Sequence, residues 1–342
     1  MRILQLLLRP QIGGAETLVA SLAAEWSRLG HTSELAYLDP DSASTGKLAR
    51  GRRLRRVIRE IDPDLVVSHS ALPNLYSAIV TPRRTPLLSV LHSATDDFAS
   101  RLLRTAEATS RSRARTVVAV SRKQVEEYVA HFPRRARPVL IPNGISDDLP
   151  RRVDRAAPPT RVITMARGAS QKEPELWLDV VDGSASLHPE LRFSWRGPIL
   201  RTDPRVMRFW ADVEARGLEH LLPGPSDDVG ADLAAADIYF HPSSREAHSI
   251  GVLEAAAVGL PVVCSEDVAA TLPAGVASAT FPSRDPAAAI AALASVVRDH
   301  PAAARRASAL SERIRTDFSI AETARAYLST AGLDPAPRSD GA

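Results

Sequence analysis

The chain has 342 residues, of which 44% are hydrophobic and 24% are charged. This composition is typical of a soluble globular protein and excludes a chain that is disordered throughout. No apolar run reaches the roughly 18 residues of a membrane-spanning helix, and the single cysteine, Cys264, excludes an internal disulfide and a multi-cysteine metal cluster. We therefore expect a cytoplasmic protein with two hydrophobic cores, because one core rarely organises so long a chain.

The net charge of +3 is unevenly distributed along the chain. Residues 1–150 carry 22 Lys and Arg against 15 Asp and Glu, whereas the remainder carries 21 against 25. The basic excess lies in residues 50–60 and 101–115, which form either solvated arginine-rich faces or a surface for an anionic membrane or a phosphorylated acceptor. The second alternative places the protein peripherally at the inner membrane face. No aromatic side chains alternate with these arginines, so we expect no nucleic-acid partner.

The first half of the chain alternates strand and helix patterns. Residues 3–8 read as a buried strand, and the apolar residues of Glu16–Leu29 fall on one face of a helix that ends at Gly30. Amphipathic helices such as 123–130 separate some of the further strands, which are predicted at residues 34–38, 64–70, 86–93, 116–121 and 138–143. This spacing is typical of βα units and predicts a parallel sheet covered on both faces.

A polar, proline-bearing segment then separates the two halves. The alternation resumes with strands at residues 161–166, 191–195, 237–243 and 260–266, and it ends in a helix at 320–331. We therefore predict a first domain (1–150), a linker (151–160), a second domain (161–318), a terminal helix (319–333) and a disordered tail (334–342).

The segment at residues 236–267 carries the most informative pattern, which is a strand, a loop and a helix. The strand ends near His241, and the helix spans residues 249–258. The free N–H groups at the start of such a helix point to the carboxyl edge of the sheet, where a diphosphate binds well. Glu246 in the loop and Glu254 in the helix can therefore face the same cleft.

This pattern resembles the E-x7-E signature of retaining GT-B glycosyltransferases, in particular glycosyltransferase family 4, with Glu246 and Glu254 at that spacing. The resemblance implies an α/β fold of two Rossmann-like parallel-sheet domains facing a cleft, with the C-terminal helix crossing back to the N-terminal domain. It implies that Glu254 holds the donor ribose, that Glu246 lies beside the transferred sugar, and that backbone N–H groups of Ser249 and Ile250 bind the diphosphate. His248 stands where the family commonly has an aromatic or glycine-flanked residue, and a contact with the sugar or acceptor is expected there.

A second motif agrees with the first. Arg167 and Lys172 follow the strand at 161–166 with the spacing of the family's G-R-x4-K-G. Two fixed cations beside the leaving diphosphate stabilise the negative charge that develops there, which removes the need for a metal. The alternative is an ordinary surface turn. The family usually has glycine where this chain has Ala166 and Glu173, and a carboxylate at Glu173 can alter the shape of the loop.

The first domain carries weaker resemblances. Gly13 and Gly14 match a glycine-rich first loop whose backbone approaches the donor phosphate or sugar, although a lone Gly-Gly is usually just a turn. His92 follows a strand where family members carry a histidine that reaches the donor sugar, and the alternative is a structural histidine. His69 also follows a strand, and a structural role is favoured for it.

We therefore expect a metal-independent, retaining glycosyltransferase without a cofactor. It moves a hexose or N-acetylhexosamine from a nucleotide diphosphate sugar, with UDP favoured, to an unidentified acceptor hydroxyl in cell-surface glycan, glycolipid or secondary-metabolite biosynthesis. The alternatives are a catalytically silent GT-B homologue that acts as a partner protein, and a GT-B relative with other nucleotide-sugar chemistry. Retention of Arg167, Lys172, Glu246 and Glu254 together argues against silence.

Overall fold

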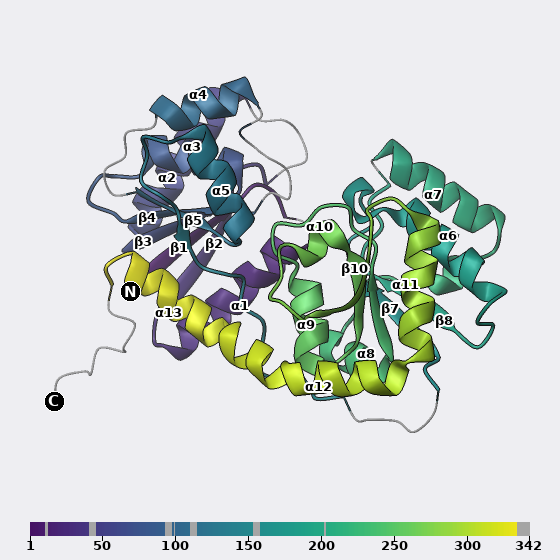
Figure 1. Cartoon of the computed structure of the whole chain (residues 1–342). Helices are drawn as coiled ribbons and strands as arrows, with labels where there is room; N and C mark the ends of the chain where they lie inside the picture. Colours follow the sequence, from purple (N-terminus) through teal and green to yellow (C-terminus); the bar gives the residue numbers. More distant parts are fainter. Residues whose placement is uncertain are drawn as a thin grey trace. The chain divides into compact units, whose positions relative to one another are not determined.

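The computed structural model describes residues 1–10, 13–40, 46–92, 98, 100–109, 115–152, 158–201 and 203–333. The chain divides into two compact units, Met1–Gly144 with Ile320–Ala342, and Ile145–Ser319 (Figure 1). Residues 153–157 of the predicted linker and the predicted tail at 334–342 lie outside the described residues.

The first unit is built on a six-stranded parallel sheet of order β2-β1-β3-β4-β5-β6. Its strands are β1 (Arg2–Leu7), β2 (Thr32–Tyr37), β3 (Leu65–His69), β4 (Leu87–Leu91), β5 (Arg115–Ala119) and β6 (Val139–Leu140). β3 and β4 are buried along their whole length, as is typical of parallel strands enclosed by helices. β6 keeps only two residues of the predicted strand at 138–143, because Pro138 and Pro142 flank it and cannot donate to a ladder.

The described helices of this unit are α1 (Gly14–Arg28), α2 (Lys47–Ile61), α3 (Ala71–Val80), α4 (Arg101–Thr109), α5 (Arg122–His131) and α13 (Ile320–Thr330). α13 comes from the far end of the chain and packs on α1. The indole of Trp26 donates to the Ala324 carbonyl at 3.2 Å, and Tyr327 meets Trp26 edge-on with ring centroids 6.2 Å apart. Both rings are fully buried, and each contributes roughly 1.5–3 kcal/mol by leaving water, so the C-terminal helix is part of the first unit's core.

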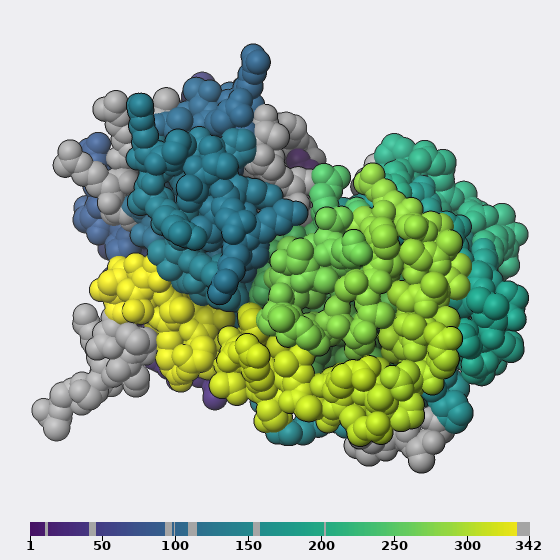
Figure 2. Space-filling model, in the orientation of Figure 1, coloured from purple at the N-terminus to yellow at the C-terminus, as the bar shows by residue number. Residues whose placement is uncertain are grey.

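The second unit is built on a five-stranded parallel sheet of order β11-β10-β9-β7-β8. Its strands are β7 (Arg161–Met165), β8 (Arg192–Arg196), β9 (Ile238–His241), β10 (Val262–Ser265) and β11 (Ala277–Phe281). Its helices are α6 (Pro174–Ala185), α7 (Pro204–Ala215), α8 (Val229–Ala235), α9 (Ile250–Val258), α10 (Glu266–Ala269), α11 (Pro286–Arg298) and α12 (His300–Asp317), with short 3-10 turns η2 (Ser170–Lys172) and η3 (Glu219–Leu221). Figure 2 shows α11 and α12 at the surface of this unit.

A contact with α12 and a glycine stop fix the end of α9. Arg315 of α12 donates from Nε to the Ala257 carbonyl at 2.9 Å, close to the end of α9. Gly259 then ends the helix in a left-handed conformation (φ 94°), which glycine adopts without strain, and its N–H returns to the Ala255 carbonyl. α9 is buried on nearly all sides, so packing against the rest of the unit stabilises it.

Candidate functional site

The topology of the second sheet marks where a ligand binds. From β7 the chain moves to β8 on one side of it and then to β9 on its other side. The order of the strands therefore reverses between β7 and β9, and open parallel sheets bind ligands at the carboxyl ends of the strands at such a point. The predicted site residues of the second unit follow these two strands, since Arg167 and Lys172 come after β7 and Glu246 and Glu254 come after β9.

Among the described residues, no side chain caps the first backbone N–H groups of α9. Ser249 is the N-cap residue, but its hydroxyl makes no capping bond and lies 3.4 Å from Nε2 of His241. The first residue of the helix is Ile250, as the phosphate-binding prediction requires. A helix start of this kind attracts an anion, because its N–H groups and the helix dipole both favour negative charge.

Gly251 is a site residue that the sequence reasoning missed. A Cβ atom at this position would lie 2.7 Å from the Tyr239 hydroxyl and 3.1 Å from the Met165 carbonyl. Only glycine therefore lets the first turn of α9 pack so closely on the ends of β7 and β9. The signal in the sequence was the glycine in the first turn of a predicted helix, where glycine is unfavourable without a packing reason.

Lys172 and Glu246, which are 74 residues apart, form an ion pair between Nζ and Oε1. Nε2 of His241 lies 2.9 Å from the same carboxylate oxygen. Only 14% of the lysine side chain and 9% of the glutamate side chain are exposed. The structure thus brings the two predicted motifs together and adds His241, whose only signal in the sequence was its place at the end of a strand.

The charges of this cluster follow from its contacts. Burial alone would raise the pKa of Glu246, but Lys172 and the hydrogen bond from His241 outweigh it and hold the pKa far below its usual range. Burial lowers the pKa of His241, despite the opposing effect of Glu246. Glu246 is therefore ionised and can only accept, so the neutral His241 ring carries its proton on Nε2 and donates it to Glu246.

Glu254 has the opposite environment. Its side chain is partly buried, and within the described residues no hydrogen bond or ion pair reaches its carboxylate. Burial raises its pKa to about 7. A carboxylate that is poorly solvated and lacks protein donors is a strong acceptor for ligand hydroxyl groups, because a ligand supplies the hydrogen bonds that the protein does not.

The loop after β7 contains Ala166 and Glu173, the two residues that stand where the family usually has glycine. Arg167 is half-buried and follows Ala166, whose N–H donates to the Arg196 carbonyl at 2.9 Å. Glu173 adopts the left-handed conformation (φ 46°, ψ 59°) that glycine favours. Its carboxylate accepts from Arg205 at 2.8 Å and from Arg284 at 3.0 Å. The loop therefore makes the turn expected of glycine, and ion pairs hold the glutamate side chain.

The remaining donor-side residue of this unit, His248, is buried against Phe318, with ring centroids 5.5 Å apart. Burial lowers the pKa of its imidazole to about 4, so the ring is neutral at neutral pH. Its place directly before Ser249 brings its backbone to the start of α9.

Three predicted site residues belong to the first unit. Gly13 is the extended N-cap residue of α1 and Gly14 is its first residue, and no described side chain caps this helix start. His92 directly follows β4, and its Nε2 lies 2.9 Å from Nδ1 of His69, which is the last residue of β3. The two histidines thus form one pair, which the sequence did not indicate.

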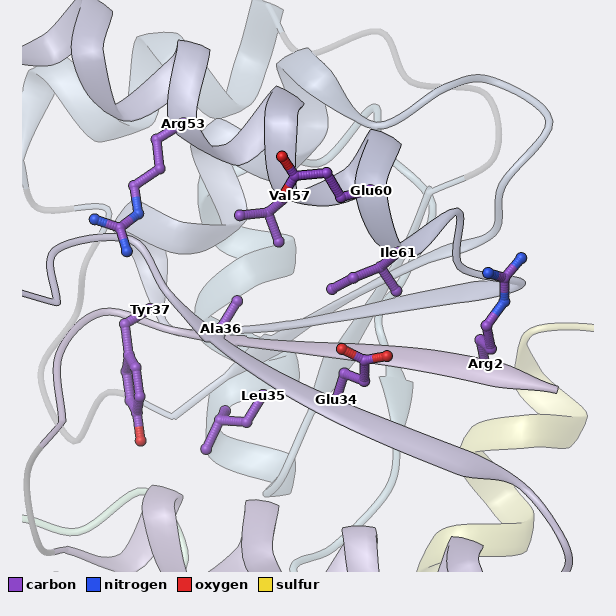
Figure 3. Close-up of a pocket in the computed structure, with 9 residues that line it drawn as sticks. All are labelled: Arg2, Glu34, Leu35, Ala36, Tyr37, Arg53, Val57, Glu60 and Ile61. Carbon is purple, nitrogen blue, oxygen red and sulfur yellow. The ribbon is translucent and has the colours of Figure 1, made fainter.

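A pocket of about 530 Å³ also lies in the first unit, between β2 and α2 (Figure 3). Ala36 of the strand points toward Val57 of the helix, whereas Leu35 and Tyr37 point to the other side of the strand, and the pocket contains none of the predicted site residues. Among the described residues no group of three or more His, Cys, Asp or Glu could hold a metal ion. In the described part of the chain, no helix combines the length and apolar character needed to cross a membrane.

Comparison with known proteins agrees with this architecture. Residues 12–149 match the family model of Glycosyltransferase Family 4, and residues 161–299 match that of Glycosyl transferases group 1. The lipopolysaccharide glucosyltransferase WaaG of Escherichia coli K12 is 29% identical over 159 residues, which are 41% of this chain and 41% of WaaG. The chain is therefore aligned with less than half the length of this curated relative.

Solved structures share the fold over nearly the whole chain. Anabaena HepE in complex with UDP and glucose has a TM-score of 0.79 at 19% identity and covers 97% of this chain and 99% of its own. Sucrose-phosphate synthase from Thermosynechococcus elongatus has a TM-score of 0.75 at 17% identity, with coverage of 96% and 98%. A WaaG structure has a TM-score of 0.70 at 17% identity, with coverage of 95% and 99%. Since the two family models match in chain order and the sheets have the expected topology, the chain belongs to the GT-B glycosyltransferases of the family 4 type.

Proposed function

We propose that this protein transfers a sugar from a nucleotide diphosphate sugar to an acceptor hydroxyl. The observation that carries the proposal is the cluster at the carboxyl ends of β7 and β9, where the Lys172–Glu246 ion pair and the unpartnered Glu254 flank the uncapped start of α9. UDP is the favoured donor nucleotide, and HepE structures that contain UDP or UDP-glucose support this choice.

In the proposed complex the ribose hydroxyls donate to Glu254. The diphosphate accepts from the backbone N–H groups at the start of α9, including those of Ser249 and Ile250. Arg167 and Lys172 balance the charge of the leaving diphosphate, and no metal is then required. Gly251 supports this arrangement because it lets α9 approach the strands closely.

The ionisation of Glu246 limits the chemistry. Since Lys172 and His241 keep this carboxylate ionised at neutral pH, it holds no proton to give to a leaving group. We propose that Glu246 accepts a hydrogen bond from the transferred sugar, and that the leaving phosphate oxygen itself takes the proton of the attacking acceptor hydroxyl. The acceptor oxygen bonds to C1 as the C1–phosphate bond breaks on the same face, so the configuration is retained.

We also propose that the enzyme is cytoplasmic and works peripherally at an anionic membrane face. α2 supports this, because Arg52, Arg55, Arg56 and Arg59 are exposed on it while Leu54 faces the core. Such a basic face attracts anionic lipid, and salt should weaken the attraction. Sedimentation with anionic vesicles but not with neutral ones, reversed by salt, is expected, and binding to neither type would contradict this part of the proposal.

The test of the donor proposal is a thermal-shift panel of UDP, GDP and ADP with their sugar conjugates, followed by a hydrolysis assay. A ligand that binds only the folded state raises the melting temperature, so UDP and a UDP-sugar should stabilise the wild type and not Glu254→Gln. Glu266→Gln is the matched control, since Glu266 is an exposed glutamate of the same unit. Binding without any hydrolysis or transfer would favour the silent homologue, and preference for GDP would refute the UDP assignment.

A further inference from the structure

His69 and His92 form a stacked pair at the carboxyl edge of the first sheet. His69 is the last residue of β3 and His92 directly follows the neighbouring strand β4, and in the register His69 lies opposite Val90. The ring centroids are 5.1 Å apart with planes 24° from parallel, and the nitrogen atoms are 2.9 Å apart. His69 is fully buried whereas His92 is partly exposed, so one ring supports the other from inside the unit.

The backbone holds His69 rigidly behind His92. Ser70, the next residue, adopts φ 76° and ψ 161°, which is strained for a residue other than glycine. Its N–H donates to the Val90 carbonyl at 3.0 Å, and Asn74 donates from Nδ2 to the same carbonyl at 3.0 Å. These bonds tie the start of α3 to β4 and fix the place of His69 against it.

The other ring nitrogen of His69 decides which way the shared hydrogen bond runs. Nε2 of His69 is buried and has no hydrogen-bond partner in the described structure. Burial lowers the pKa of both rings, that of His92 to about 4, so each ring is neutral and carries one proton. If His92 donated to His69, the proton of His69 would lie on its buried, unpartnered Nε2.

The reverse arrangement avoids this cost. With the proton of His69 on Nδ1, His69 donates to Nε2 of His92 and leaves only a bare lone pair buried. Orphaned buried N–H groups are rarer in proteins than under-satisfied acceptors, so this arrangement is favoured. His92 must then carry its own proton on Nδ1, which makes no hydrogen bond within the described residues.

We infer that His69 is a positioning residue that fixes His92 as the Nδ1–H tautomer, so that His92 presents a hydrogen-bond donor to a substrate oxygen. This inference rests on the proposed function, in which the protein binds a nucleotide sugar, and on the expectation from the family resemblance that His92 reaches the donor sugar. A hydroxyl oxygen of that sugar is the group such a donor recognises. A neutral ring with a fixed donor binds it without first having to select a tautomer.

The tautomer can be measured without turnover. Long-range 1H–15N spectra of the whole chain report which nitrogen of each imidazole is protonated, and a His92→Gln sample assigns the His92 signals. We expect His92 to be protonated on Nδ1 in the wild type and in His69→Asn, because an asparagine amide can place an N–H near the position of Nδ1. In His69→Leu we expect the proton to shift at least partly to Nε2. A wild-type His92 protonated on Nε2, or an unchanged pattern in His69→Leu, would overturn the inference.

Kinetics separate positioning from a structural role. His69→Leu should lower kcat about tenfold or more with the melting temperature compared in parallel, while His69→Asn should restore kcat to within about threefold of the wild type. Ser68→Ala is the control, since Ser68 is equally buried and its hydroxyl makes no hydrogen bond within the described residues. Equal kcat loss in both His69 variants would contradict positioning through the hydrogen bond. If His69→Leu does not fold, the wild-type and His69→Asn spectra still decide the tautomer. Correct tautomers in a protein that turns over no nucleotide sugar would refute the proposed function and leave the assignment of the pair intact.

Discussion

Replacement of Glu254 by glutamine should make the protein more stable and less able to bind its donor. Burial raises the pKa of Glu254 from its usual 4.5 to about 7. Because one pKa unit corresponds to about 1.4 kcal/mol, the ionised carboxylate costs the folded state roughly 3–4 kcal/mol at most. The side chain is partly exposed, so water reduces this cost, and we expect a gain of roughly 1–3 kcal/mol in Glu254→Gln.

The sign of the pH dependence follows from the raised pKa. The folded state binds the proton of Glu254 more tightly than the unfolded state, so this group contributes stability below pH 4.5 that is lost as the pH rises through about 7. Glutamine carries no charge at any pH, so the variant does not lose stability in this way as the pH rises. The variant should therefore match the wild type near pH 4.5 and exceed it at pH 8.5, where roughly 2–4 °C in melting temperature is expected for each kcal/mol.

The assay is a thermal melt of wild type and Glu254→Gln from pH 4.5 to 8.5, with and without UDP. UDP should raise the melting temperature of the wild type and leave that of the variant unchanged, since in the variant the ribose of UDP no longer meets the ionised carboxylate of Glu254. Glu266→Gln is the control and should show neither effect. A variant less stable than the wild type at pH 8.5, or a difference that does not depend on pH, would refute the reasoning that Glu254 is unpaired and poorly solvated.

Three further predictions concern the leaving-group side of the site. Lys172→Ala should lower kcat about 10²–10³-fold with a smaller effect on donor KM, because the cation acts mainly as charge develops; near-normal turnover in steady-state kinetics would contradict this. The same substitution should also raise the pKa of Glu246, so that the activity of the variant falls at acidic pH where that of the wild type does not. Chelation by EDTA should leave the rate of sugar transfer unchanged. A loss of activity that Mg²⁺ or Mn²⁺ restores would show that a metal ion also stabilises the leaving diphosphate. Glu173→Gly and Glu173→Ala both lose the bonds to Arg205 and Arg284, but only the alanine variant keeps a strained left-handed residue at this position. Chemical denaturation should therefore find the alanine variant less stable than the glycine variant by about 1 kcal/mol. Equal stabilities would argue against strain at this position.

Local patterns in the sequence were sufficient to predict the α/β architecture. The strand predicted at 161–166 and the helix predicted at 249–258 correspond to β7 and α9, because apolar runs, turn residues and the stop at Gly259 act over a few residues. The E-x7-E spacing was sufficient to indicate the family, since Glu246 and Glu254 are close in the sequence and lie on one loop and the helix that follows it. β11 at Ala277–Phe281 was missed, because its alternating small and polar residues resemble a loop as much as an edge strand.

Only the tertiary structure decided how the site residues interact. The sequence did not indicate how the two glutamates ionise, whereas folding pairs Glu246 with Lys172 from 74 residues away and leaves Glu254 without a partner among the described residues, so their pKa values move in opposite directions. The contact of His69 with His92 likewise depends on the register of β3 against β4. The physical reason is that strand and helix formation is governed by neighbours along the chain, while ionisation and hydrogen bonding depend on burial and on which charges folding brings within a few ångströms.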